Sequence, residues 1–271
     1  MSKIKKLIDE VATFLLDMDG VLYVGNTPIE GAAKTVAYLR RKGKKIIFMT
    51  NNSGSTRRAY VLKLAKIGIA ARESDVLTSG YVAMLYLRER APRARVYVVG
   101  ELGLKKEIIN GGFKVLTDRR AEEADFVVVG LDRAMSYKRL TAGVRALLAG
   151  AEMIATNMDA TYPTEGGLSP GAGAVVGALS ASSGKPPKVV IGKPSPFMIK
   201  LALGIVGSRP SKTAIVGDKL STDILAGKRF GLKTILVLSG VTSKHDIKKT
   251  RKAEEMPDLV APSIKSLMVG K

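Results

Sequence analysis

Short apolar runs alternate with amphipathic stretches along nearly the whole chain. Several of the runs are hydrophobic at almost every position, which indicates strands that are buried on both faces of a parallel sheet. The predicted strands are Thr13–Asp17, Lys45–Thr50, Arg95–Val99, Asp125–Gly130, Met153–Thr156, Lys188–Ile191, Thr213–Gly217 and Thr234–Leu238. The predicted helices lie between them, at residues 30–42, 56–67, 80–90, 136–149, 172–183, 196–206 and 221–230. The alternation predicts an α/β fold.

Length and hydrophobicity narrow the class of protein. The chain has 271 residues, of which 46% are hydrophobic, so it can form one large domain or two modest ones with a real core. No run reaches the ~18 uninterrupted apolar residues of a spanning helix. Asp9 and Glu10 interrupt the basic N-terminus where a signal peptide would be apolar. We therefore expect a cytoplasmic protein without a membrane partner.

The residue types that are missing exclude several kinds of chemistry. There is no cysteine, and His245 is the single histidine. A disulfide scaffold, a cysteine nucleophile, a thiolate metal site and a multi-histidine metal site are therefore excluded. If the chain binds a metal, the side-chain ligands must be mostly oxygens, which favours Mg²⁺ or a similar hard ion.

Two predicted strands end in polar residues that could contact a ligand. The segment Phe14–Leu22 ends its apolar run in Asp17 and continues through Asp19 to Gly20. An ordinary Asp-Gly turn is the alternative interpretation. The segment Ile46–Gly54 ends in Thr50 and leads toward a helix N-terminus, where an anion can bind. Simple helix capping by a serine or threonine is the alternative here.

Two later strands end in the same way. Lys193 follows the predicted strand Lys188–Ile191, and a fixed ammonium there can neutralise a phosphate or carboxylate charge; a solvated surface lysine is the alternative. Asp218 follows Thr213–Gly217, and Asp223 comes five residues later. Asp223 can instead be a first-turn helix residue that the helix dipole favours. Because parallel strands present their carboxyl ends at one edge of a sheet, we expect these side chains to gather there.

In this order, the strings DMDGVL, TNNSG, GKPSP and GDKLSTDI resemble the haloacid dehalogenase-like phosphohydrolases. The resemblance runs from about residue 10 to 240 and is greatest to the branch of 4-nitrophenyl phosphatases and phosphoglycolate phosphatases. The segment 156–173 is similar to the cap signature of that branch. The resemblance implies a Rossmann-like parallel-sheet core at residues 1–78 and 185–271. A second, smaller α/β cap domain would be inserted at residues 79–184.

The resemblance also implies roles for the core residues. Asp17 would be the nucleophile that forms an aspartyl-phosphate. Asp19 would be the general acid and then the general base. Mg²⁺ would be held by Asp17, the backbone carbonyl of Asp19 and Asp218, with Asp223 as a supporting ligand. The oxygens of the phosphoryl group would be bound by Thr50, the backbone around Asn51 and Asn52, and Lys193.

Four residues of the cap signature are candidates for contact with the leaving group: Asn157, Asp159, Thr161 and Tyr162. The alternative is that Asn157 and Asp159 only hold the turns of their own loop.

The net charge of +20 is concentrated outside the predicted cap. Residues 79–184 carry 13 Lys and Arg against 11 Asp and Glu, a net +2, whereas the remainder carries 31 against 13, a net +18. The densest basic runs, residues 40–45 and 248–252, lie away from the predicted strand ends and lack the interleaved aromatic residues of a single-strand nucleic-acid platform. The pattern disfavours a nucleic-acid partner, and a generally basic surface is the simpler explanation.

The leading hypothesis is a Mg²⁺-dependent hydrolase of small-molecule phosphomonoesters that acts through an aspartyl-phosphate. Its partner would be a small phosphorylated metabolite. Two alternatives stay open at this point, phosphotransfer to an acceptor other than water and polyanion binding without catalysis. Caps of this branch can take part in dimer contacts, so a homodimer is also open.

Overall fold

The computed structural model describes residues 3–164 and 167–268. They divide into two compact units. The first unit comprises the chain up to Thr50, the segment Val61–Leu77 and the chain from Lys193 onward. The second comprises Asn51–Tyr60 and Thr78–Gly192. Each unit is built on its own parallel sheet, so the predicted α/β fold is confirmed.

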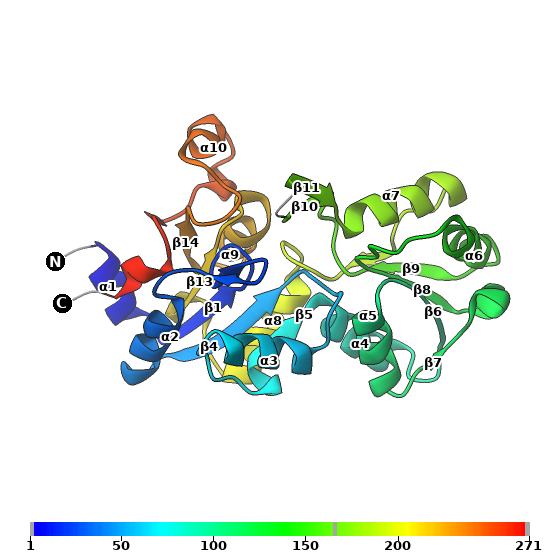
Figure 1. The fold of residues 1–271 in the computed structure, drawn as a ribbon, viewed down its shortest axis with the longest axis horizontal. Helices are drawn as coiled ribbons and strands as arrows, with labels where there is room; N and C mark the ends of the chain where they lie inside the picture. Colours follow the sequence, from blue (N-terminus) through cyan, green and yellow to red (C-terminus); the bar gives the residue numbers. More distant parts are fainter. Residues whose placement is uncertain (1–2, 165–166, 269–271) are drawn as a thin grey trace. The chain divides into compact units, whose positions relative to one another are not determined.

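The sheet of the first unit has the strand order β15-β14-β13-β1-β4-β5. Its strands are β1 (Thr13–Asp17), β4 (Lys45–Thr50), β5 (Val76–Thr78), β13 (Thr213–Gly217), β14 (Lys233–Val237) and β15 (Leu259–Ala261). β1 runs parallel to both of its neighbours, and Figure 1 shows β13 and β1 side by side. The register pairs Leu16 with Val216 and Asp17 with Met49. Asp17, Thr50 and Asp218 therefore reach the same edge of the sheet.

The order of these strands creates a switch point between β1 and β13. From β1 the chain continues to β4 and β5 on one side, and the later strands β13, β14 and β15 extend the sheet on the other. Ligands of open parallel sheets bind outside the carboxyl ends of the strands at such a point. Asp17 and Asp218 end the two strands that flank it. The topology therefore places two of the predicted site residues where a ligand is expected.

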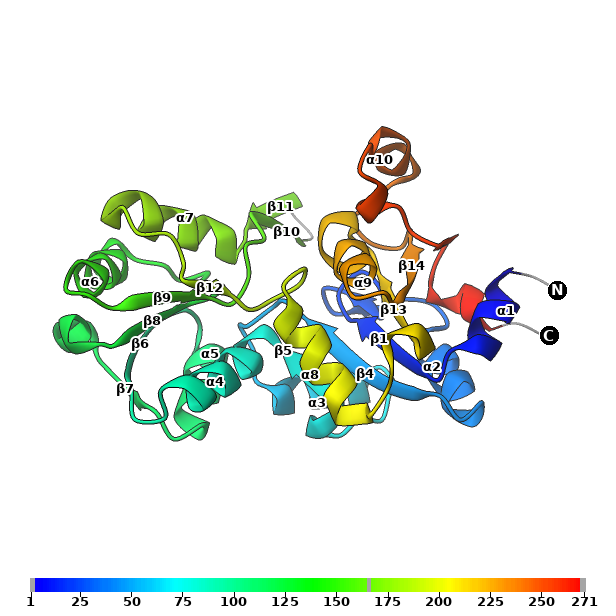
Figure 2. The same ribbon diagram turned by 180° about the vertical axis from the view of Figure 1, so that it is seen from behind.

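Helices flank the sheet of the first unit. They are α1 (Lys3–Glu10), α2 (Ala32–Arg41), α3 (Arg57–Lys66), α8 (Pro196–Val206), α9 (Leu225–Arg229) and α10 (Lys244–Lys249), and α3 begins in the segment assigned to the second unit. α8 packs on β4, on the face turned toward the viewer in Figure 2. Gly207 ends α8 in the left-handed conformation that glycine adopts readily, with φ of 59°. The central strand β1 is buried at every position.

The second unit has a five-stranded parallel sheet in the order β12-β9-β8-β6-β7. Its strands are β6 (Arg95–Val99), β7 (Lys114–Val115), β8 (Phe126–Val129), β9 (Glu152–Ala155) and β12 (Val189–Val190). The helices are α4 (Ser79–Arg90), α5 (Leu102–Asn110), α6 (Tyr137–Leu148) and α7 (Ala172–Ser183). α6 and α7 cover one face, and α4 and α5 lie on the other (Figure 1). Tyr97, Val127 and Leu179 belong to the apolar core of this unit.

Several elements were not predicted from the sequence, among them the strands β5, β7 and β15 and the helices α1, α5 and α10. α5 was not predicted, because Gly103 in its first turn weakens the helical pattern; a Cβ there would overlap the carbonyl of Gly54. The predicted helix 221–230 begins instead as a π-helical turn, η4 (Leu220–Ile224), before α9. The cap signature contains an unpredicted hairpin of β10 (Thr161–Thr164) and β11 (Gly167–Pro170). All eight predicted strands are present, some with shifted or shorter bounds.

The remaining elements are short. They are the hairpin strands β2 (Tyr23–Val24) and β3 (Thr27–Pro28) and the turns η1 (Glu73–Asp75), η2 (Asp118–Glu123), η3 (Pro210–Lys212), η5 (Ala253–Glu255) and η6 (Ile264–Leu267). Across the described part of the chain, we find no helix with the length and apolar character that crossing a membrane would require.

Candidate active site

The chain turns sharply just after Asp17. Asp17 is the last residue of β1, and Gly20 follows with a φ of 77°, a conformation that residues with a Cβ rarely adopt. The N–H of Gly20 donates to the carbonyl of Tyr23 at 2.8 Å, and Ser239 Oγ donates to the carbonyl of Gly20 at 2.7 Å. A buried strand therefore ends in a fixed loop that carries Asp19.

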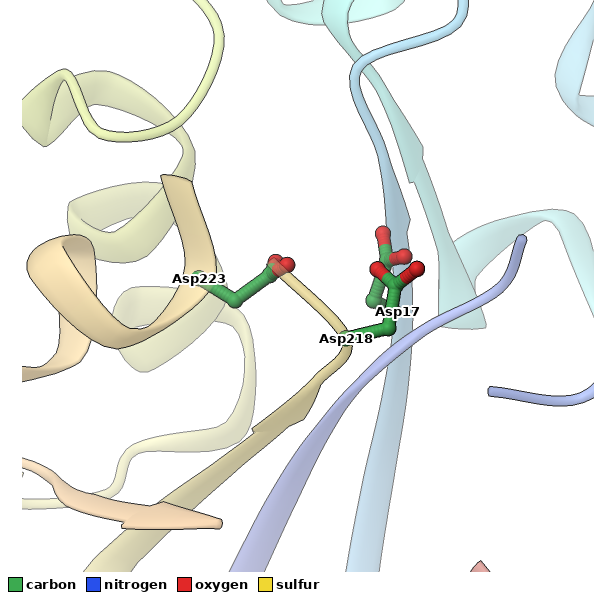
Figure 3. Close-up of side chains that lie close together, drawn as sticks. All are labelled: Asp17, Asp218 and Asp223. Atoms are coloured by element: carbon green, nitrogen blue, oxygen red, sulfur yellow. The ribbon is translucent and has the colours of Figure 1, made fainter. Parts of the chain in front are cut away.

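Three carboxylates come together at the carboxyl end of the sheet. Asp17, Asp218 and Asp223 each offer one oxygen, and these oxygens lie within 4.8 Å of one another. All three residues are buried. In Figure 3 the side chain of Asp223 extends from its helical turn toward Asp17 and Asp218, which follow the strand ends. The close approach of Asp223 depends on Gly217, where a Cβ would overlap the Asp223 side chain.

One buried ammonium group lies among these carboxylates. Lys193 Nζ donates to Asp17 Oδ1 at 2.5 Å and to Asp223 Oδ1 at 2.6 Å, and the lysine side chain is only 3% exposed. Because this ion pair is buried, removing either partner would leave an uncompensated charge away from water. The described part of this cluster thus carries three carboxylates around one ammonium.

The electrostatics show that this ammonium does not compensate all of the negative charge. Burial raises the pKa of Asp17 well above its usual range, with Lys193 opposing the shift and the other two carboxylates adding to it. Burial, together with Asp223, raises the pKa of Asp218 to about 7. Burial disfavours the charged form of Lys193, but Asp17 and Asp223 outweigh this effect and raise its pKa. The site has an excess of negative charge that a cation would relieve.

Asp19 lies in a different environment from Asp17. It is partly buried, and burial raises the pKa of its carboxyl group while Lys63 and then Lys193 oppose the shift. Lys63 Nζ lies over the ring of Tyr23, 3.6 Å from the ring centroid. A carboxyl group with a raised pKa can hold a proton nearer to neutrality than a free aspartate does. The carboxylate of Asp19 is not part of the three-carboxylate cluster among the described residues.

The other predicted site residues fall into two groups. Thr50 ends β4 in the first unit and is buried. In the second unit, Asn51 Nδ2 donates to Asp159 Oδ2 at 2.9 Å, and Asn157 Nδ2 donates to the carbonyl of Asn51 at 2.6 Å. Asn52 Oδ1 accepts from the N–H of Gly54 at 2.8 Å. Thr161 and Tyr162 are on the hairpin strand β10. The structure therefore brings Asn157 and Asp159 to Asn51.

Comparison with known proteins bears on what this site does. The family model "haloacid dehalogenase-like hydrolase" matches residues 14–114, and the model "HAD-hydrolase-like" matches residues 190–267. The acid sugar phosphatase of Staphylococcus epidermidis is 38% identical over 234 residues, which are 86% of this chain and 89% of that protein. The chain belongs to the haloacid dehalogenase-like hydrolases.

Solved structures place this hydrolase in the 4-nitrophenyl phosphatase-like branch of the family. The 4-nitrophenylphosphatase of Thermotoga maritima matches with a TM-score of 0.89 and 33% identity, over 96% of this chain and 97% of that one. The glycerol phosphate phosphatase of Mycobacterium tuberculosis, solved in complex with calcium, matches with a TM-score of 0.87 and 33% identity, over 96% and 76%. The hydrolase is a phosphatase of phosphoric monoesters, and its carboxylate cluster can bind a divalent metal.

A further segment of the hydrolase contacts Asp218 and was missed in the sequence. The N–H of Val241 donates to Asp218 Oδ2 at 2.8 Å, and the N–H of Thr242 donates to the carbonyl of Asp218 at 3.2 Å. Gly240 precedes them, and a Cβ on it would overlap the Asp218 carboxylate. The sequence feature that could have indicated this contact is Gly240, a glycine shortly after the strand Lys233–Val237 in the string Leu-Ser-Gly-Val-Thr.

We expect Gly240→Ala to inactivate this hydrolase without unfolding it. The new methyl group must displace the Asp218 carboxylate, and a displacement of ~1 Å in a catalytic constellation can cost ~100-fold in rate. The measurement is phosphate release from 4-nitrophenyl phosphate, alongside the circular dichroism spectrum. Gly43→Ala is not a suitable control, because its φ is 71°, whereas Gly204→Ala meets open space without a positive φ and should retain activity. Equal activity of the two variants would contradict the prediction.

Proposed function

We propose that the protein is a Mg²⁺-dependent phosphatase that hydrolyses small-molecule phosphomonoesters through an aspartyl-phosphate on Asp17. The observation that carries this proposal is the cluster of Asp17, Asp218 and Asp223 around Lys193 at the switch point of a parallel sheet. This arrangement offers a nucleophile, a cation site and a fixed positive charge within one buried space.

The residues of the cluster suit a hard divalent cation. All of the side-chain donors are carboxylate oxygens, which Mg²⁺ prefers, and burial together with the neighbouring carboxylates raises the pKa values of Asp17 and Asp218. Asp17, Asp218 and the backbone carbonyl of Asp19 would hold the ion, with Asp223 in support. When bound, the ion would screen the repulsion between the carboxylates and the phosphate and would orient the phosphoryl group.

The proposed reaction has two steps. In the first, an oxygen of Asp17 attacks phosphorus, the bond from phosphorus to the ester oxygen breaks, and Asp19 donates its proton to the departing oxygen. In the second, Asp19 takes a proton from a water molecule, whose oxygen attacks the same phosphorus. The acyl phosphate bond then breaks, which releases inorganic phosphate and restores the Asp17 carboxylate. The separate environment of Asp19 suits this exchange of a proton.

Binding of the phosphoryl oxygens is proposed for Thr50, the backbone of Asn51 and Asn52, and Lys193. Thr50 and Asp17 end neighbouring strands, and the Lys193 ammonium is already held beside Asp17. Such fixed donors stabilise the charge that develops in the transition state without reorganising. Lys193 therefore has two proposed roles, since it also orients the nucleophile through its contact with Asp17.

The names of the relatives support a proposal for the substrate class. The relatives are named acid sugar phosphatase, 4-nitrophenylphosphatase and glycerol phosphate phosphatase, names that indicate small phosphomonoesters. We propose a substrate of that class for this chain. The expected cap, residues 79–184, would shape its selectivity, with Thr161 and Tyr162 of the hairpin as candidates for contact with the leaving group.

Removal of divalent metal should abolish phosphatase activity, and Mg²⁺ should restore it. The excess of buried negative charge would otherwise repel the phosphate dianion. The measurement is phosphate release from 4-nitrophenyl phosphate and glycerol phosphate after chelation and dialysis, with and without added Mg²⁺. Ca²⁺ serves as the comparison ion, since it prefers longer bonds and more ligands. Full activity of the metal-free protein would exclude the proposed metal dependence, and no activity on any small phosphomonoester would exclude the proposed substrate class.

A further inference from the structure

Asn51 is held by three side chains of the second unit. Its carbonyl oxygen accepts from Ser79 Oγ at 2.5 Å and from Asn157 Nδ2 at 2.6 Å. Its side-chain Nδ2 donates to Asp159 Oδ2 at 2.9 Å. Ser79 and Asn157 are buried, with exposed fractions of 0% and 3%. Both the carbonyl and the side chain of Asn51 are therefore directed at this cluster, which we call the Asn51 network.

The network is tightly packed and has a hydrogen bond between two of its members. The N–H of Asp159 donates to Asn157 Oδ1 at 3.0 Å, so two of the three residues that hold Asn51 also hold each other. Gly192 completes the packing, because a Cβ on it would lie 2.7 Å from Asn51 Oδ1 and 2.9 Å from Asn157 Cβ. Partly buried hydrogen bonds that share members in this way restrain Asn51 to one arrangement.

The network is joined by peptide bonds to two residues of the proposed phosphate site. Asn51 follows Thr50 directly, and Gly192 directly precedes Lys193. A residue whose carbonyl and side chain are both fixed constrains the peptide planes on either side of it. The position of Asn51 therefore limits where the Thr50 hydroxyl and the following backbone amides can lie.

We propose that Ser79, Asn157 and Asp159 are positioning residues that act on the phosphoryl group through Asn51, and that Asn157 and Asp159 do not select the leaving group. This inference rests on the proposed function and adds that different residues of the cap signature have different roles. Asn157 and Asp159 would help to position the phosphoryl group, which all phosphomonoesters share. The hairpin residues would contact the leaving group, which differs between substrates.

Inhibition by inorganic phosphate tests the proposal, because inorganic phosphate has no leaving group. Asp159→Ala removes the acceptor for Asn51 Nδ2 and should raise the inhibition constant of phosphate by about 10-fold, since hydrogen bonds to charged groups are stronger than those between neutral groups. Loss of folded protein would lower the apparent kcat but would leave this constant unchanged. Asp159→Asn keeps an acceptor oxygen at the same place and should restore the constant toward the wild-type value. Asp125→Ala, which removes a surface carboxylate of the same unit, is the matched control.

A second measurement compares substrates with different leaving groups. In Asp159→Ala, kcat/KM for 4-nitrophenyl phosphate and for glycerol phosphate should fall by the same factor, about 10-fold or more. A double-mutant cycle completes the test, because Asp159→Ala should have little further effect in protein that already carries Asn51→Ala. Non-additivity of this kind shows that Asp159 acts through Asn51.

The outcomes separate this inference from the function on which it rests. If the wild-type protein hydrolyses neither ester, the proposed function fails. In another outcome, the wild type is active, but Asp159→Ala changes the ratio of kcat/KM for the two substrates and leaves the inhibition constant of phosphate unchanged. In that case Asp159 contacts the leaving group and the inference is wrong. Additive effects of Asn51→Ala and Asp159→Ala would also overturn it.

Discussion

Asp17→Asn should lower phosphate release from 4-nitrophenyl phosphate by about a thousandfold or more, as expected when a covalent mechanism loses its nucleophile. The amide is close in size to the carboxylate, so Lys193 can keep its contact with Asp223 and still donate to the amide oxygen. What the amide lacks is a charged oxygen that can attack phosphorus. We therefore expect a folded protein without activity.

A mass measurement and a control variant test this prediction together with phosphate release. After an acid quench, the mass of the wild-type protein should include a fraction that is heavier by one phosphoryl group, and the variant should show none. Asp258→Asn is the control, because Asp258 is a carboxylate of the same unit that binds Lys228 and the backbone N–H of Thr234, away from the cluster. It should affect stability but not catalysis. An Asp17→Asn protein as active as the wild type would show that Asp17 is not the nucleophile.

Lys193→Met should be both inactive and markedly less stable. The substitution leaves Asp17 and Asp223 without the ammonium that lies between them, and removing one partner of a buried ion pair typically costs ~3–5 kcal/mol of unfolding free energy. The rate of phosphate release should fall by ~100-fold or more. The site loses the positive charge that would stabilise the phosphoryl group, and it loses the contact that orients Asp17. Urea unfolding in metal-free buffer measures the first effect.

The matched control is Lys228→Met in the same unit. Lys228 pairs with Asp258, but both side chains are about a third exposed, so solvent screens the pair and the expected cost is ~1 kcal/mol or less. Added Mg²⁺ should recover more stability in Lys193→Met than in the wild type, because only the variant lacks an internal cation. Equal stability of the two lysine variants would contradict the structural role assigned to Lys193.

The sheet and the core motifs could be predicted because their signals are local. β1, β4, β6 and β13 have the predicted bounds, since each is a buried apolar run whose end is marked by a polar or glycine residue. Parallel strands end at a shared edge, so the meeting of Asp17 and Asp218 follows from the fold class. The helix α5 was missed because its first turn contains Gly103, which is required by a neighbour distant in sequence.

The contacts of the cap signature could not be predicted for the same reason. Asn157 and Asn51 are 106 positions apart, and nothing in either local sequence indicates that they meet. The sequence offered contact with the leaving group or local turns as explanations for Asn157 and Asp159. The structure shows the local turn, in which the N–H of Asp159 donates to Asn157 Oδ1, and in addition both side chains bind Asn51, which neither explanation included. The π-helical turn that presents Asp223 also lacks a clear sequence signal, because its residues fit an ordinary α-helix equally well.

The division of the chain has a consequence for building chimeras. Asn51–Tyr60 belongs to the second unit although it directly continues β4 of the first. A graft that transplants only Thr78–Gly192 from a relative would therefore leave the host's Asn51 facing foreign partners in place of Ser79, Asn157 and Asp159. Transplanting Asn51–Tyr60 together with the larger segment keeps the donor's hydrogen bonds whole. The natural module for exchange in this protein is therefore discontinuous, and its first cut lies immediately after Thr50.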